Sequence, residues 1–149
     1  MPVVISETVL LLAGPFDERL DAERVAGAIG RGLAADGRLA CDLCPLEKEP
    51  CARTADASKP LDAIDFDRRM RAARALVIAC AHLDDRALAG SVAFEAATRA
   101  RQGGVPAYAI TANDELDRFE ARIVDLQVIV EAATPRALTA AGKKLARVL

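Results

Sequence analysis

Aromatic residues are scarce in this sequence, which has no tryptophan, one tyrosine and four phenylalanines among 149 residues. Proteins that bind unpaired bases use aromatic rings as stacking surfaces, and proteins that bind phosphate backbones carry a positive field. The formal net charge here is -2 at pH 7, so the chain has little of either feature. We therefore expect no nucleic-acid partner.

Long apolar runs are also missing. The longest runs, 9–13 and 75–81, fall far short of the roughly 20 residues that a membrane-spanning helix needs. The amino-terminal stretch MPVVISETVLLL has neither the basic start nor the cleavage site of a secretory signal. We expect no membrane partner and a cytoplasmic location.

What the chain does have is a regular alternation of apolar runs and amphipathic segments. Hydrophobic residues make up 52% of the sequence, enough for one well-buried core at this length. The pattern predicts strands at 9–13, 39–45, 75–81, 106–111 and 124–130, and helices at 22–35, 64–73, 88–102, 116–122 and 135–148. It predicts a single three-layer α/β domain over 1–149. Its parallel five-stranded sheet, with helices on both faces, is Rossmann- or flavodoxin-like in order 2-1-3-4-5.

The segment 46–60, LEKEPCARTADASKP, breaks this alternation because it is polar and has no period. We expect an irregular loop there, and a loop of this length calls for a reason.

Cysteine is placed unevenly along the chain. Cys44, Cys51 and Cys80, with the single histidine His82, could converge as a zinc site near the carboxyl ends of strands. Cys41 belongs to a C-x-x-C with Cys44, but residues three apart on a strand point to opposite faces. The alternative is that Cys41 and Cys80 are buried apolar residues while Cys44 and Cys51 are loop thiols.

The loop expected after the third strand carries the other polar candidates. His82 beside Asp84 has the composition of a general base supported by a carboxylate. The alternative is that Asp84 or Asp85 caps the next helix and that His82 is a partly exposed loop residue. Gly90 and Ser91, at the start of that helix, could hold a small anion through backbone N–H groups.

Two segments resemble the class I glycerate kinases, a family that phosphorylates glycerate with ATP and magnesium. The first is LAGPFDERLDAERVAGAIGRGL at 12–33, which is similar to the family pattern APDSFKxSLSAxEVAxAIxxGL. The second, at 79–112, matches the family at Asp84, Gly90 and the Gly104-Val105-Pro106 turn, among other positions. The stretch from Thr134 resembles the family's last helix. The resemblance implies the Rossmann-like domain of a glycerate kinase, without the family's second domain.

The departures from the family pattern lie at the polar positions. The family's Asp, Ser and Lys in the first loop are replaced by Gly14, Pro15 and Asp17, and a later Lys is replaced by Ser91. Its DGGEGT run is replaced by EKEPCART at 47–54. Phosphoryl transfer depends on positioning and charge neutralisation, so these replacements predict a loss of kinase activity. The resemblance implies a ligand-binding set of Gly14, Phe16, Asp17, Asp84, Asp85, Gly90 and Ser91.

Three functions remain open from the sequence. The first is a glycerate-kinase-like domain without kinase activity that binds a small anionic molecule or a protein partner, with no cofactor expected. The second is an active kinase of glycerate that uses ATP and Mg and is completed by a partner subunit, which would make a homo-oligomer. The third is the zinc-binding module of Cys44, Cys51, Cys80 and His82.

Overall fold

The computed structural model describes residues 7–84, 88–119 and 125–149. Its elements are β1 (Thr8–Ala13), α1 (Ala22–Leu33), β2 (Ala40–Pro45), α2 (Ser58–Ala63), α3 (Phe66–Arg71), β3 (Ala75–Asp84), α5 (Val92–Gln102), β4 (Ala107–Glu115), β5 (Leu126–Glu131) and α7 (Pro135–Ala146). In this part of the chain, no helix has the length and apolar content needed to cross a bilayer.

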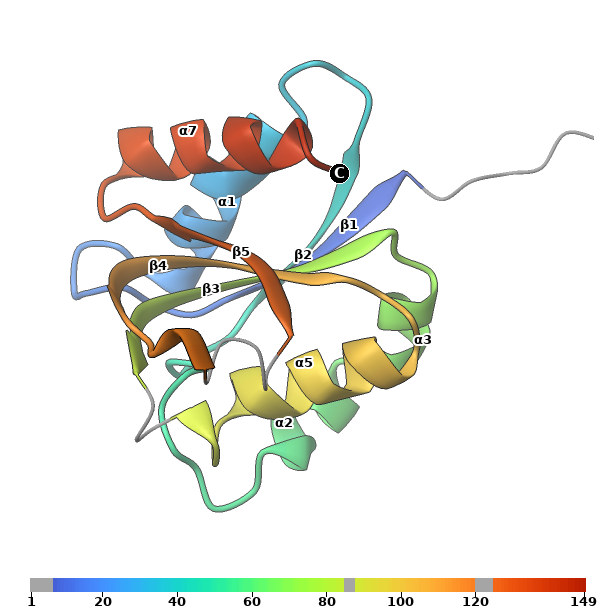
Figure 1. Cartoon of the computed structure of the whole chain (residues 1–149). Helices are drawn as coiled ribbons and strands as arrows, with labels where there is room; N and C mark the ends of the chain where they lie inside the picture. Colours follow the sequence, from blue (N-terminus) through green and yellow to red (C-terminus); the bar gives the residue numbers. More distant parts are fainter. Residues whose placement is uncertain (1–6, 85–87, 120–124) are drawn as a thin grey trace, which may run out of the picture.

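The strands form one parallel sheet in the order β2-β1-β3-β4-β5, so the predicted class and strand order are both confirmed. Helices α1 and α7 cover one face, and α2, α3 and α5 cover the other (Figure 1). Alternate residues of β1 feed the two layers: Val9 and Leu11 pack towards α1 and α7, while Leu10 and Leu12 pack towards the other three helices. This two-sided burial explains why β1 is apolar throughout.

The predicted third strand, 75–81, is too short. β3 continues to Asp84 and pairs with an equally extended β4, with His82 opposite Asn113 and Asp84 opposite Glu115. His82 and Asp84 therefore lie on a strand rather than in a loop. The apolar run ends at Ala81, but the parallel partner supplies backbone pairing to polar residues beyond it.

Several helix boundaries also differ from the prediction. Helix α5 begins at Val92 rather than residue 88, with Ser91 as its N-cap, so Asp84 does not cap this helix, and Asp85 lies outside the described residues. The helix expected at 64–73 is shorter, since α3 spans Phe66–Arg71, and a separate short helix, α2, begins at Ser58, inside the expected 46–60 loop. Asp65, with a left-handed φ of 57°, separates them. Of the helix expected at 116–122, residues 118 and 119 are helical and 116 and 117 are not. Residues 120–122 lie outside the described residues.

The two helices on the first face meet with their backbones in contact. A Cβ atom added to Gly32 of α1 would lie 2.0 Å from the Thr139 carbonyl oxygen of α7, and one added to Gly142 would lie 2.4 Å from the Ile29 carbonyl oxygen. The Thr139 hydroxyl donates a hydrogen bond of 2.9 Å to the Ala28 carbonyl across the same contact. Glycine is required here because no side chain fits between the helices.

Ion pairs link the helices on the other face of the sheet. Arg99 of α5 makes ion pairs with Glu95 at 3.0 Å, with Asp62 of α2 at 3.1 Å and with Asp67 of α3 at 3.2 Å. Arg69 of α3 donates hydrogen bonds to both carboxylate oxygens of Asp42 on β2. These ion pairs add to the apolar packing of the short helices, whose Leu61, Phe66 and Met70 side chains are buried in the core.

We expect Gly32→Ala to lower the free energy of unfolding by about 1–3 kcal/mol, because its methyl group must push α7 away. Gly27→Ala is the matched control in the same helix, since its added Cβ meets only the Arg31 side chain at 3.6 Å. The control should be neutral or gain up to about 1 kcal/mol from helix propensity. Urea unfolding midpoints check both variants, and equal losses would contradict the close helix contact.

We expect Asp42→Asn to cost about 1–2 kcal/mol at neutral pH, because it removes a partly buried, charge-assisted bond pair with Arg69. The hydrogen bond from Arg69 lowers the pKa of Asp42 below its ordinary value of 3.8. A lowered pKa in the folded state stabilises the fold at pH values above the unfolded pKa. The difference between wild type and variant should therefore be constant above about pH 5 and shrink as the pH falls through the folded-state pKa of Asp42. Unfolding curves measured from pH 7 to pH 3 check this.

Candidate functional site

The candidate site lies at the carboxyl edge of the sheet, where β1 and β3 lead to helices on opposite faces. Parallel sheets of this order bind ligands in the crevice at that point. Here the segment 46–57, which we call the crevice loop, runs from β2 to α2 (Figure 1). A Cβ atom added to Gly14 would lie 2.2 Å from Cδ of Pro50, so the loop packs directly on the end of β1. Gly14 therefore makes room for Pro50.

Glu49 joins the crevice loop to β3. One oxygen of its carboxylate accepts the N–H of Ala81 at 2.7 Å, and the other accepts the N–H of Cys51 at 3.0 Å. Burial raises the pKa of Glu49, and the two backbone bonds oppose part of that rise. The carboxylate thus binds an N–H group of β3 close to the carboxyl edge of the sheet.

The amino terminus of α5 is closed by the same loop. The N–H of Ala93 donates to the Pro50 carbonyl at 2.8 Å, and the N–H of Phe94 donates to the Ser91 hydroxyl at 3.1 Å. Ser91 is only 1% exposed, and its hydroxyl donates to the Leu88 carbonyl at 2.6 Å. A Cβ atom added to Gly90 would lie 3.1 Å from the Arg53 side chain. The candidate anion site at Gly90 and Ser91 is therefore occupied by protein atoms.

In the loop after β1, the side chain of Asp17 forms hydrogen bonds within its own turn. Oδ1 of Asp17 accepts the backbone N–H groups of Arg19 and Leu20, both at 2.8 Å, and so shapes its own turn. Phe16 packs partly buried against the α1 and α7 layer. Asp85, also a candidate ligand residue, lies outside the described residues.

His82 lies among polar side chains at the ends of β3 and β4. Its Nε2 is 3.0 Å from Asp84 and 3.4 Å from Glu115, and its Nδ1 is 3.1 Å from the side-chain amide of Asn113. With the amide nitrogen donating to Nδ1, the ring proton stays on Nε2 and faces the carboxylates. Both ring nitrogens are therefore engaged by protein groups, which suits a role in holding the strand ends together.

The cysteines separate into two groups. Cys44 is 4% exposed on β2, where burial raises the pKa of its thiol to about 11, and Cys41 lies on the opposite face of that strand. Cys51 and Cys80 meet near Glu49, and the ligand atoms of these three residues lie within 4.8 Å of one another. The hydrogen bond between the Cys51 and Cys80 side chains, together with burial, raises the pKa of Cys51 well above its usual range.

The structure thus brings together half of the four residues considered as zinc ligands. Cys51 and Cys80 converge, whereas Cys44 and His82 lie outside the three-residue cluster. Leu83 packs in the same layer as Cys80, so the strand alternation breaks between them and His82 is directed to the other face. Glu49 takes a place that the sequence did not assign. The E-x-C spacing of Glu49 and Cys51 indicates a possible pair of metal ligands. Nothing in the sequence places this pair beside Cys80.

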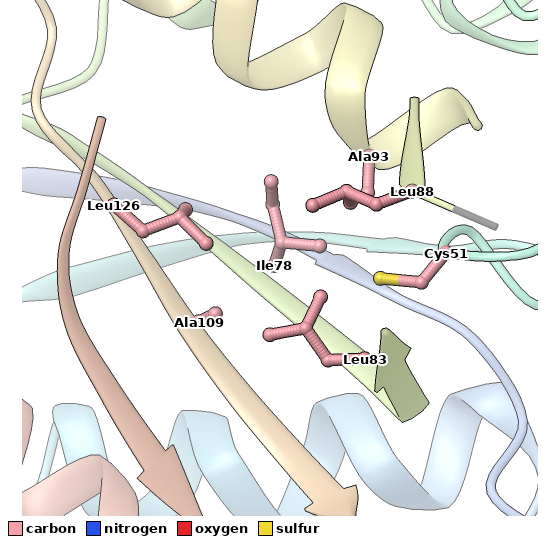
Figure 2. Close-up of a pocket in the computed structure, with 7 residues that line it drawn as sticks. All are labelled: Cys51, Ile78, Leu83, Leu88, Ala93, Ala109 and Leu126. Atoms are coloured by element: carbon pink, nitrogen blue, oxygen red, sulfur yellow. The ribbon is translucent and has the colours of Figure 1, made fainter. Parts of the chain in front are cut away.

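Two cavities among the described residues are unsuited to an anionic ligand, because one is very small and the other is acidic. An apolar cavity of about 10 Å³, drawn in Figure 2, has room for about one water. Its lining comes from the crevice loop, β3, β4, β5, the start of α5 and the segment before α5: Cys51, Ile78, Leu83, Leu88, Ala93, Ala109 and Leu126. An open groove of about 410 Å³ beside the start of α1 is lined by three carboxylates, those of Asp21, Glu23 and Glu47, and by no basic residue of the described chain.

Comparisons with known proteins give no family. None of the protein-family models and none of the curated proteins matches the chain. Among solved structures, the chain is similar to an oxidoreductase from Corynebacterium diphtheriae, with a TM-score of 0.47 and 10% sequence identity. The likeness covers 95% of this chain and 96% of that one. A likeness of this size carries no functional argument.

We expect Glu49→Ala to speed hydrogen exchange at the amides of Ala81 and Cys51, because both lose their acceptor. Amides in the middle of β3, such as that of Ile78, keep their sheet partners and serve as the internal control. Exchange measured by NMR on wild type and variant checks this. Unchanged protection at Ala81 would show that Glu49 does not hold the crevice loop in solution.

Proposed function

We propose that this chain is a glycerate-kinase-like domain that performs no phosphoryl transfer and acts as a binding domain. The observation that supports the proposal most directly is the crevice loop. Pro50 packs on Gly14, Glu49 binds the N–H of Ala81, and the Pro50 carbonyl binds the N–H of Ala93. These contacts lie in the crevice where a doubly wound sheet ordinarily receives its ligand.

The charges around the crevice support the same proposal. A kinase must neutralise the charge of the transferred phosphoryl group with lysine, arginine or metal ions. The resemblance puts Asp17 and Ser91 where the family has lysine. Asp17 bonds to its own turn and Ser91 is buried as a helix cap. Neither residue supplies positive charge to a nucleotide.

Of the two ligand classes, the geometry favours a protein partner over a small anion. The N–H groups that an anion would need at α5 already donate to Pro50 and Ser91. The open groove beside the start of α1 is lined by Asp21, Glu23 and Glu47, whose carboxylates repel an anion. A basic or neutral polar surface of another protein meets neither obstacle.

The purified full chain should form no phosphoglycerate when it is incubated with ATP, Mg²⁺ and glycerate. Kinases typically turn over at about 1–100 s⁻¹, so an assay with ATP labelled in the γ-phosphate detects even a very poor enzyme. An active glycerate kinase in the same mixture is the positive control. Turnover of about 1 s⁻¹ or more would overturn the proposal.

The same assay separates the alternative of a kinase completed by a partner subunit. Activity that requires a second copy rises faster than linearly with protein concentration, so the assay is run over a wide concentration range. Calorimetric titration with inorganic phosphate tests the anion class and should show no binding heat. Saturable binding of phosphate would favour the small-anion class instead.

A further inference from the structure

Glu49, Cys51 and Cys80 form a compact group of metal-binding side chains. Two come from the crevice loop and one from β3, and their ligand atoms lie within 4.8 Å of one another. In a tetrahedral zinc shell with Zn–S near 2.3 Å and Zn–O near 2.0 Å, neighbouring ligand atoms are about 3.3–3.8 Å apart. The three side chains therefore need only small rotations to close around one ion.

The protein around this group already holds the ligands in position. Both carboxylate oxygens of Glu49 accept a backbone N–H, and each keeps a further lone pair. Bonds of this kind from surrounding groups orient metal ligands and increase affinity. Cys51 is 2% exposed and Cys80 is fully buried, so neither thiol needs to be recruited from solvent.

The ligand types select the kind of ion. Two sulfurs and one carboxylate oxygen suit a thiophilic cation, whereas Mg²⁺ and Ca²⁺ prefer shells made entirely of oxygen. A divalent cation also offsets two of the three negative charges that one carboxylate and two thiolates carry. With three protein ligands, the fourth tetrahedral position is filled by water.

We propose that Glu49, Cys51 and Cys80 bind one zinc-class divalent cation, which joins the crevice loop to β3. Binding replaces the two thiol protons, which pass to solvent, and no oxidation or reduction takes place. This proposal is independent of the missing kinase activity, because it concerns the attachment of the loop rather than any phosphoryl transfer. Its ligand set differs from the one expected from the sequence, since Glu49 enters while Cys44 and His82 leave.

The reduced, metal-free full chain should bind one equivalent of Zn²⁺ in competition with a chromophoric chelator. Co²⁺ used as a probe should give a thiolate-to-cobalt charge-transfer band in the near ultraviolet. The thermal midpoint should rise with added Zn²⁺, because binding to the folded state alone stabilises it. A chain that binds no Zn²⁺, or binds Co²⁺ without the charge-transfer band, would overturn the proposal.

Variants locate the ion. Cys51→Ala and Cys80→Ala should abolish the charge-transfer band, and Glu49→Gln should weaken zinc binding about 10- to 100-fold. Cys41→Ala is the matched control, since Cys41 is a partly exposed thiol outside the cluster, and it should bind as the wild type does. Circular dichroism confirms that each variant is folded, and Glu49→Gln, which removes no core volume, keeps the test valid if a cysteine variant unfolds.

Two outcomes would count against the site even if metal binds. Binding that is lost in Cys41→Ala but retained in Cys51→Ala would place the ion elsewhere. Rapid formation of a Cys51–Cys80 disulfide under mild oxidant, with no zinc protection of either thiol, would assign the pair to redox chemistry instead.

Discussion

The carboxylate of Glu49 is the interaction on which the arrangement of the carboxyl edge depends. It binds the backbone N–H of Ala81 in the last part of β3 and the N–H of Cys51 in its own loop. These two bonds place Pro50 over Gly14 and the Pro50 carbonyl on the first turn of α5. One side chain therefore determines how the crevice loop lies across β1, β3 and α5. A buried carboxylate is costly without such partners, which explains why both oxygens are bonded.

The crevice loop supplies acceptors for backbone N–H groups at the switch point of the doubly wound sheet. The fold leaves strand-end and helix-start N–H groups exposed at this edge, and these groups need acceptors. In ligand-binding proteins a phosphate serves as the acceptor. Here Glu49, Pro50 and Ser91 are the acceptors. The N–H groups of Ala81, Ala93 and Phe94 are therefore bonded by the chain itself.

The sequence was a good guide wherever burial produced periodicity. The runs at β1 and the first part of β3 are apolar because both faces of the sheet are covered, and the strand order followed from the regular alternation. Polar strand ends were missed, since His82 and Asn113 owe their strand conformation to each other's backbone and not to hydrophobic pattern. Two glycines also have packing contacts that the sequence does not predict. Gly14 and Gly90 were assigned to ligand binding, but the first makes room for Pro50 and the second lies against Arg53.

The site was harder to predict than the fold because its members are brought together by tertiary structure. Glu49 lies in a stretch with no period, and its partner Ala81 is 32 residues away. Cys51 and Cys80 were candidates from residue type alone, but the break in alternation before Leu83 removes His82 from their side of the sheet. Such breaks depend on the neighbouring strand and leave no mark in the sequence.

The contact of α1 with α7 through Gly32 and Gly142 makes the two faces of the sheet mechanically unequal. Backbones in contact cannot slide past each other without opening a gap, so this pair behaves as a single stiff plate. On the opposite face, α2, α3 and α5 are joined by the ion pairs of Arg99, which tolerate small changes of distance and orientation. The crevice loop acts directly on the more adjustable face, because the Pro50 carbonyl binds the first turn of α5, whereas α1 and α7 are fixed to each other by backbone contact.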